Sequence, residues 1–98
     1  NMDNFTYQYL KDLLEIGHEI EFDFGGIFCS INNCQNENHK ASWYFSTNHK
    51  DEFTDTFLAD FYDVESLLTS LDKIKIKEKS LEEIIDQNLY DSSSLTIF

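Results

Sequence analysis

The sequence predicts an α+β protein with an N-terminal helix, an antiparallel meander of three or four strands, and two C-terminal helices packed on one sheet face. Three observations predict this class. Apolar residues recur at helical spacing between positions 5 and 16, acidic and apolar residues alternate before a diglycine, and a capping-box motif opens a segment near the C-terminus. The 98 residues suit one domain, which we take to span 1–98 with Met2 as the natural start after Asn1.

The first helix is expected over residues 4–16, where the apolar positions fall on one face. Asp3 or Asn4 can cap its start, and Gly17 can adopt the left-handed conformation that commonly ends a helix.

A β-hairpin follows, because residues 19–24 alternate acidic and apolar side chains and Gly25-Gly26 suits a two-residue turn. A tight turn pairs Phe24 with Ile27 and Phe22 with Cys29, so the large apolar side chains point inward. The same register leaves Phe28 on the acidic face.

The middle of the chain is expected to continue the meander. Residues 32–40 are polar and predict a loop, and residues 41–47 predict a third strand. Residues 55–61 fit either a short fourth strand or a helix, and the alternation favours the strand.

The C-terminal third predicts two helices. Asp63 can cap a helix over 64–71, and Ser80 with Glu83 forms a capping box for a helix over 81–88. Between the two helices, residues 73–77 are expected to form a connector or an edge strand. Residues 91–98 follow the second helix and are expected to form a tail or a short final strand. The predicted core comprises Phe5, Leu10, Leu13, Leu14, Ile20, Phe22, Phe24, Trp43, Phe45, Leu67, Leu68, Ile84 and Ile85.

The charge is strongly acidic, with 19 acids against 7 bases and a net charge of −12. All the bases are Lys. This balance disfavours direct binding to nucleic acid or to an anionic membrane and favours a basic protein partner. No apolar run suits a membrane span or a secretion signal, so we expect a cytoplasmic protein, with self-association as a further option.

The best metal candidate is the set Cys29, Cys34, His39 and His49, spaced C-x4-C-x4-H-x9-H. These are ligand types that zinc prefers, but the usual C-x2-C knuckle is missing and the core claims Cys29. Cys34 with a histidine has the residue types of a nucleophilic pair without a surrounding signature. We therefore expect no cofactor and favour a protein without catalytic activity.

A binding surface is expected on the acidic face of the hairpin. Its candidate residues are Glu19, Glu21, Asp23 and Phe28. Tyr44 is a further candidate from a second surface, the aromatic set Trp43, Tyr44 and Tyr62. An exposed aromatic ring among acids suits a protein-binding patch, and the alternative is that a helix or the tail covers it.

The pieces "GHEIEFDFGGIFCSI", "SWYFS", "FYDVESLL" and "KIKEKSLEEI" follow one another in an order that covers most of the chain. In this order the sequence resembles a group of small uncharacterised acidic α+β proteins of low-GC Gram-positive bacteria and their mobile elements. Glu78 departs from the group, which tends to carry Gly before Lys-Ser-Leu. The resemblance implies no activity.

Together these observations predict a small cytosolic interaction or accessory domain. One alternative is an acidic mimic of nucleic acid that blocks a DNA- or RNA-binding protein. A second is a zinc-binding domain or a metal-dependent enzyme.

Overall fold

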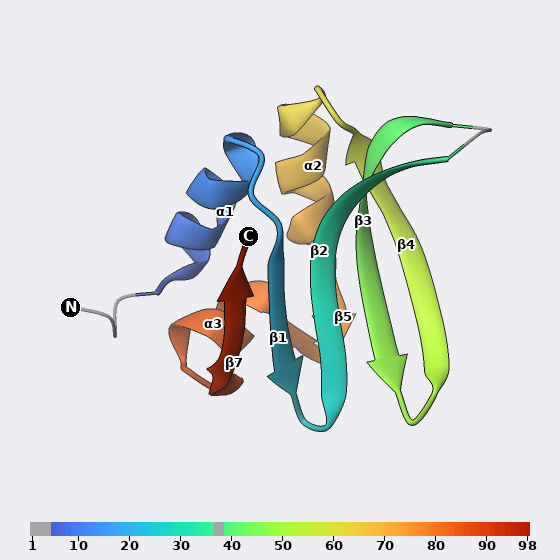
Figure 1. The fold of residues 1–98 in the computed structure, drawn as a ribbon. Helices are drawn as coiled ribbons and strands as arrows, with labels where there is room; N and C mark the ends of the chain where they lie inside the picture. Colours follow the sequence, from blue (N-terminus) through green and yellow to red (C-terminus); the bar gives the residue numbers. More distant parts are fainter. Residues whose placement is uncertain (1–4, 37–38) are drawn as a thin grey trace.

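The computed structural model describes residues 5–36 and 39–98, which form an α+β fold (Figure 1). Its elements in chain order are α1 (Tyr7–Glu15), β1 (Ile20–Phe24), β2 (Ile27–Asn36), β3 (His39–His49), β4 (Glu52–Asp60), α2 (Val64–Leu71), β5 (Lys75–Ile76), β6 (Lys79–Ser80), α3 (Leu81–Asp86) and β7 (Asp91–Ile97).

The main sheet has five antiparallel strands in the order β4-β3-β2-β1-β7. The first four strands form the predicted meander. The C-terminal residues add a fifth strand, β7, beside β1 (Figure 1). Of the two structures expected for 91–98, a tail or a strand, the strand is therefore the one observed. β5 and β6 form a separate two-stranded hairpin, so the segment expected as a connector or edge strand contributes one short strand.

The β1–β2 register is the predicted one: Phe24 pairs with Ile27, and Phe22 pairs with Cys29. Phe22 and Cys29 are buried, whereas Asp23 and Phe28 are exposed. The alternation of the sequence therefore fixes which side chains enter the core, because side chains along a strand point alternately to the two faces.

Three hairpin turns place both central residues at positive φ, as a type I′ turn requires. The pairs are Gly25-Gly26 (φ 58° and 81°), Lys50-Asp51 (φ 53° and 66°) and Lys77-Glu78 (φ 51° and 67°). Only the first pair consists of glycine, so the other two turns hold four side chains in a conformation that L-residues adopt at a cost.

The predicted loop over 32–40 is wrong. β2 continues to Asn36 and β3 begins at His39, so the strand expected over 41–47 is longer at both ends. The polar side chains of β2 support this extension: the Asn32 Nδ2 donates to Ser30 Oγ at 3.0 Å and to Ser46 Oγ at 3.1 Å. Asparagine here bridges neighbouring strands instead of turning the chain.

Residues 55–60 belong to a strand, as favoured, because β4 runs from Glu52 to Asp60 along β3. Phe61 follows the strand and stacks on Trp43, with ring centroids 5.6 Å apart. The Trp43 Nε1 donates to the Phe61 carbonyl at 3.2 Å, so this buried indole is hydrogen-bonded.

The predicted caps of α1, Asp3 and Asn4, lie outside the described residues, and the N-cap of α1 is Thr6. Its Oγ1 accepts from the Tyr9 N–H at 3.0 Å. After the helix, Gly17 takes φ 96°, as expected of a residue that ends a helix.

The caps of α2 and α3 are the predicted ones. The Asp63 side chain accepts from the Ser66 N–H at 3.1 Å. Ser80 Oγ accepts from the Glu83 N–H at 3.1 Å, and Glu83 Oε1 accepts from the Ser80 N–H at 2.9 Å. α3 ends at Asp86, which is earlier than expected.

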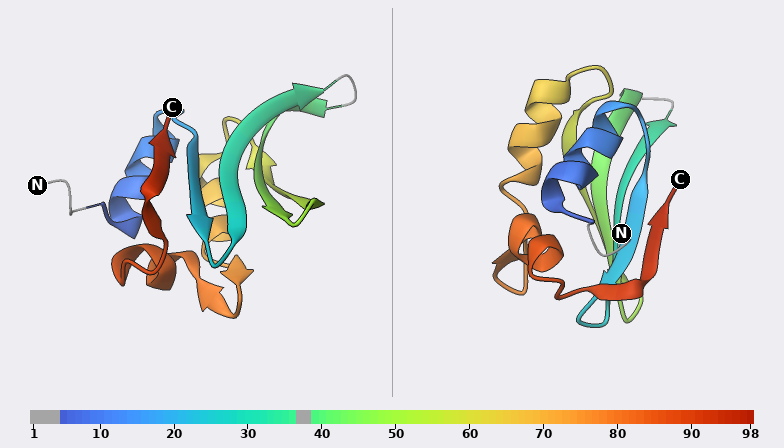
Figure 2. Two further views of the ribbon diagram at one scale, coloured as in Figure 1. Left: turned by 60° about the horizontal axis from the view of Figure 1, so that its bottom comes forward. Right: turned by 90° about the vertical axis from the view of Figure 1, so that its left-hand side faces the viewer.

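The helices lie on one side of the main sheet (Figure 2), and the core fills the space between. The predicted core residues are buried apart from Phe5 and Leu68, which pack against the core while partly exposed. Tyr7 joins the three helices: its O–H donates to Asp72 Oδ1 at 2.7 Å beyond α2, and its N–H donates to Asp86 Oδ1 at 2.8 Å in α3. Burial and Asp72 together raise the pKa of the Tyr7 phenol.

Candidate binding face of the sheet

The face of the main sheet opposite the helices carries no covering element among the described residues (Figure 2). Its side chains are those that alternate with the core residues along each strand. We call this surface the open face.

One row of paired residues crosses the open face from edge to edge. Asp91 on β7 pairs with Asp23 on β1, and Asp23 pairs with Phe28 on β2. Phe28 in turn pairs with Asn48 on β3, and Asn48 with Phe53 on β4. Directly paired residues hold their Cβ atoms about 5 Å apart, so this row is a continuous strip of surface.

Phe28 lies within a shallow hollow of about 450 Å³ on this row. Its side chain is 38% exposed, which is unusual for a large apolar residue inside a five-stranded sheet. The remaining lining residues are Asp23, Gly25, Gly26, Asn48, Lys50, Asp51 and Asp91. Three acidic residues and one lysine therefore line the hollow together with the ring, and we call this hollow the Phe28 pocket.

The next row is polar and internally hydrogen-bonded. Glu21 pairs with Ser30, Ser30 with Ser46, and Ser46 with Asp55. The Ser46 hydroxyl donates to Asp55 Oδ1 at 2.6 Å. This bond and the two that Asn32 Nδ2 donates to Ser30 and Ser46 connect side chains of β2, β3 and β4, so this part of the open face is preorganised.

A third row ends in an aromatic pair. Asn32 pairs with Tyr44, and Tyr44 pairs with Phe57 on β4. The two rings meet edge to face with centroids 5.9 Å apart, and Phe57 is 55% exposed.

Of the five predicted binding residues, the structure places Asp23 and Phe28 in the Phe28 pocket, and Glu21 and Tyr44 in the second and third rows. Glu19 has a different position. It precedes β1, and its Oε2 accepts from the Asn33 N–H of β2 at 2.8 Å. β2 extends past the start of β1, so the Asn33 N–H has no backbone acceptor on β1. The Glu19 carboxylate accepts this hydrogen bond instead.

The sequence reasoning missed four polar residues of the Phe28 pocket: Asn48, Lys50, Asp51 and Asp91. Lys50 and Asp51 form the β3–β4 turn, and Asn48 lies near the end of β3 in the same polar stretch, which resembles a loop. Asp91 reaches the pocket only because β7 pairs with β1, and this pairing is irregular: between Glu21 and Asp23 the register shifts. The Ser94 hydroxyl accommodates the shift by accepting from the Asp23 N–H at 2.8 Å and donating to the Asp91 carbonyl at 2.6 Å.

The structure does not assemble the proposed metal set. Cys29 is buried on the core side of β2, and Cys34, five residues along the same strand, is exposed. An odd spacing places them on opposite faces, about 16 Å apart along the strand. The side chain of His39 lies outside the described residues. Among the side chains that the structure describes, no group of three or more His, Cys, Asp and Glu is arranged to hold a metal ion.

The environment of Cys29 also makes a poor nucleophile. Burial, with a smaller contribution from the charge of Asp23, raises the pKa of its thiol to about 12. The thiolate is the reactive form, so Cys29 is inert at neutral pH.

No protein-family model, curated protein or solved structure matches this chain.

In the described part of the chain, each helix is too short or too polar to cross a membrane.

Proposed function

We propose that this protein is an interaction domain without catalytic activity, and that its open face binds a basic segment of a partner protein. The observation that carries the proposal is the Phe28 pocket, where an exposed aromatic ring lies among Asp23, Asp51 and Asp91.

The chemistry of this pocket suits a Lys or Arg side chain. A cation placed over the Phe28 ring is attracted by the π-electron face, with about 0.5–1 kcal/mol expected at an exposed site. Its charged end can reach the carboxylates of Asp23 and Asp91, which lie on neighbouring strands. The aromatic pair Tyr44–Phe57 offers a second contact further along the same face.

The charge of the whole chain supports the same class of partner. A net charge of −12 attracts basic proteins over distances of about one Debye length and raises their association rate. In this proposal the protein acts in the cytoplasm, where an exposed thiol such as that of Cys34 stays reduced.

The nucleic-acid mimic has less support. A mimic needs carboxylates in rows along one face, whereas several carboxylates of this chain have structural roles elsewhere. Asp63 and Glu83 cap helices, and Asp72 and Asp86 accept from Tyr7. The zinc alternative has less support for the reason given above, since Cys29 and Cys34 lie on opposite faces of β2.

The proposal is tested by capture of partners from the native cell on the wild type and three variants. Asp23→Asn and Phe28→Ser alter the pocket. Glu65→Gln removes an equal charge from an exposed position on α2 and serves as the control. We expect both pocket variants to lose a basic partner that the wild type and the control retain.

The capture is repeated at increasing salt, since an electrostatic contact weakens as the ions screen it. A partner kept by both pocket variants would contradict the proposal. A partner lost equally from Asp23→Asn and Glu65→Gln would favour a diffuse charge effect, as expected of a mimic.

A further inference from the structure

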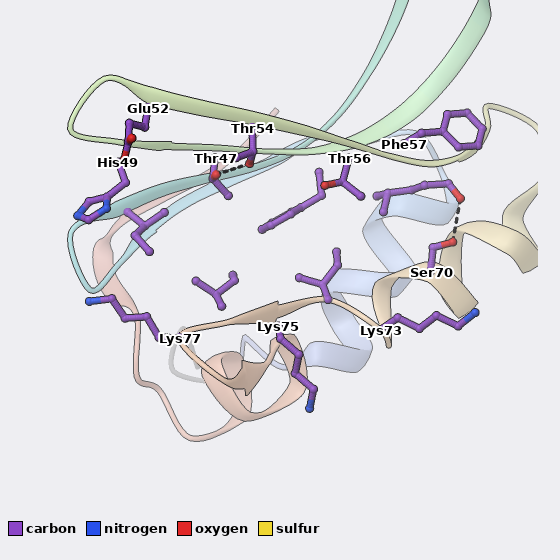
Figure 3. A pocket seen from close by; sticks show the side chains of 15 residues that line it. Thr47, His49, Glu52, Thr54, Thr56, Phe57, Ser70, Lys73, Lys75 and Lys77 are labelled. Carbon is purple, nitrogen blue, oxygen red and sulfur yellow. Dashed lines mark hydrogen bonds between the residues drawn. The ribbon is translucent and has the colours of Figure 1, made fainter.

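A second hollow lies on the helix side of the sheet, at the opposite face from the Phe28 pocket. It has a volume of about 630 Å³ and runs between strands β3 and β4 and the segment 73–77 (Figure 3). This volume falls within the range of about 300–1,000 Å³ that is usual for small-molecule sites. We call it the lysine groove.

The groove exists because α2 covers only one end of β4. Leu58 and Ala59 are buried beneath the helix, and the Ser70 hydroxyl of α2 donates to the Leu58 carbonyl at 2.8 Å. Thr54 and Thr56, earlier on β4, point to the same side of the sheet and are exposed. This end of the core is therefore not covered by α2, and the segment 73–77 forms the other wall of the groove.

The floor of the groove is apolar. Phe45 lines it from β3, and Ile74 and Ile76 line it from the segment 73–77. Threonine hydroxyls complete the sheet wall, where the hydroxyls of Thr47 and Thr54 form a short hydrogen bond with each other. A hydrocarbon chain would bury apolar surface here without displacing any structural element.

The charge of the segment that borders the groove is opposite to that of the protein as a whole. Four of the chain's seven basic residues fall within 73–79, and three of them line the groove, with Glu52 the single carboxylate on the lining. Figure 3 shows Lys73 and Lys75 directed away from the hollow and Lys77 at the end where His49 lies.

Lys77 can bind a further group. Its Nζ donates one hydrogen bond to the Gly25 carbonyl at 2.8 Å, and an ammonium group has three N–H donors. The remaining donors, with His49 on the same lining, suit a carboxylate at this end of the groove.

We propose that the lysine groove binds a medium-chain fatty carboxylate, with the carboxylate at Lys77 and His49 and the chain over Phe45, Ile74 and Ile76. The proposal is independent of the open face. It rests on the volume, the apolar floor and a cationic end in a chain that is otherwise strongly acidic.

The test uses sodium decanoate as the probe and the backbone amide NMR shifts of the full chain as the measurement. We expect saturable shifts at the groove, including Thr47, Thr54, Ile76 and Lys77. Decyltrimethylammonium has the same chain with the opposite charge, and it should bind more weakly.

Two variants separate the carboxylate end from the chain end. Lys77→Gln should weaken decanoate binding roughly tenfold, the usual scale for loss of one charge-assisted hydrogen bond. Lys79→Gln removes the same charge outside the lining and should leave the affinity unchanged. Thr56→Tyr fills the hollow from an exposed position and should abolish binding while the melting temperature stays the same.

Three results would overturn the proposal. They are the absence of saturable shifts, equal binding of the cationic probe, and shifts at the groove that depend on protein concentration alone. The last would assign this groove to contact between two copies of the chain.

Discussion

Asp23 and Phe28 face each other across the β1–β2 ladder, and both point away from the helices. Their neighbours in the same strands, Phe22 and Cys29, point into the core and are buried. The turn that buries one pair therefore exposes the other. This relationship places an aromatic ring beside a carboxylate at the surface, and the proposed function depends on it.

Replacement of Glu78 by glycine should stabilise the protein. Glu78 holds φ 67° in the β5–β6 turn, a conformation that costs an L-residue about 1 kcal/mol and costs glycine little. We expect Glu78→Gly to raise the free energy of unfolding by up to about 1 kcal/mol, measured by urea denaturation.

The control for this prediction is Gly26→Ala. Gly26 has φ 81°, and a Cβ added there would meet no atom within 4 Å, so the variant tests backbone conformation alone. It should lose stability. A Glu78→Gly variant that is less stable than the wild type would show that the carboxylate of Glu78 outweighs its backbone strain.

Removal of the α3 cap should destabilise the protein. Ser80→Ala deletes the hydroxyl that accepts from the Glu83 N–H, and loss of such a cap costs about 1 kcal/mol. Thermal denaturation followed by circular dichroism measures the change. Ser80→Thr keeps an acceptor at the cap and should stay close to the wild type, whereas equal losses in both variants would contradict a capping role.

Stability should fall at alkaline pH. The pKa of Cys29 rises from an ordinary 9.0 to about 12 in the folded state, because the buried site disfavours the thiolate. The unfolded chain releases this proton first, so the stabilising effect is complete below pH 9 and is lost as the pH rises toward 12. The pKa of the Tyr7 phenol is also raised above its ordinary value of 10.0, so this group adds to the loss of stability at higher pH.

Urea denaturation at several pH values between 8 and about 11 measures this loss. Cys29→Ala removes one titrating group, so its stability should depend less steeply on pH than that of the wild type. A free energy of unfolding that stays level or increases over this range would contradict a raised pKa of the buried Cys29 thiol.

The two thiols should react at different rates with an aromatic disulfide reagent at neutral pH. Cys34 is exposed and should react at once, whereas Cys29 is fully buried and should react only when the chain unfolds. The count of fast thiols by absorbance should be one for the wild type and zero for Cys34→Ser. Two fast thiols in the wild type would show that β2 opens in the native state.

The hairpin could be predicted from the sequence because its signals are local. The alternation over 19–24 and the diglycine determine the register without reference to the rest of the chain. The caps at Asp63 and Ser80 are local in the same way, since each bonds to a residue three positions ahead.

The sequence-based predictions failed at two kinds of residue. One kind has its partners far away in the sequence, and the other kind is an amino acid that is common in turns. Asn32 and Asn33 indicate a loop by composition, yet they lie in a long strand where Ser46 and Glu19 satisfy them. Asp91 joins the Phe28 pocket only through pairing with Asp23, 68 positions away in the sequence numbering. No local pattern indicates that contact.

The most direct test of the open face is photo-crosslinking in the native cell from position 28. A benzoyl-phenylalanine introduced as Phe28→Bpa keeps an aromatic ring at the pocket, and Ile16→Bpa places the same probe at a residue that is 74% exposed just beyond α1. We predict a crosslinked basic protein from position 28 that is absent from position 16 and disappears when Asp23→Asn is added. The same crosslinked protein from both positions, or persistence with Asp23→Asn, would contradict binding at the Phe28 pocket.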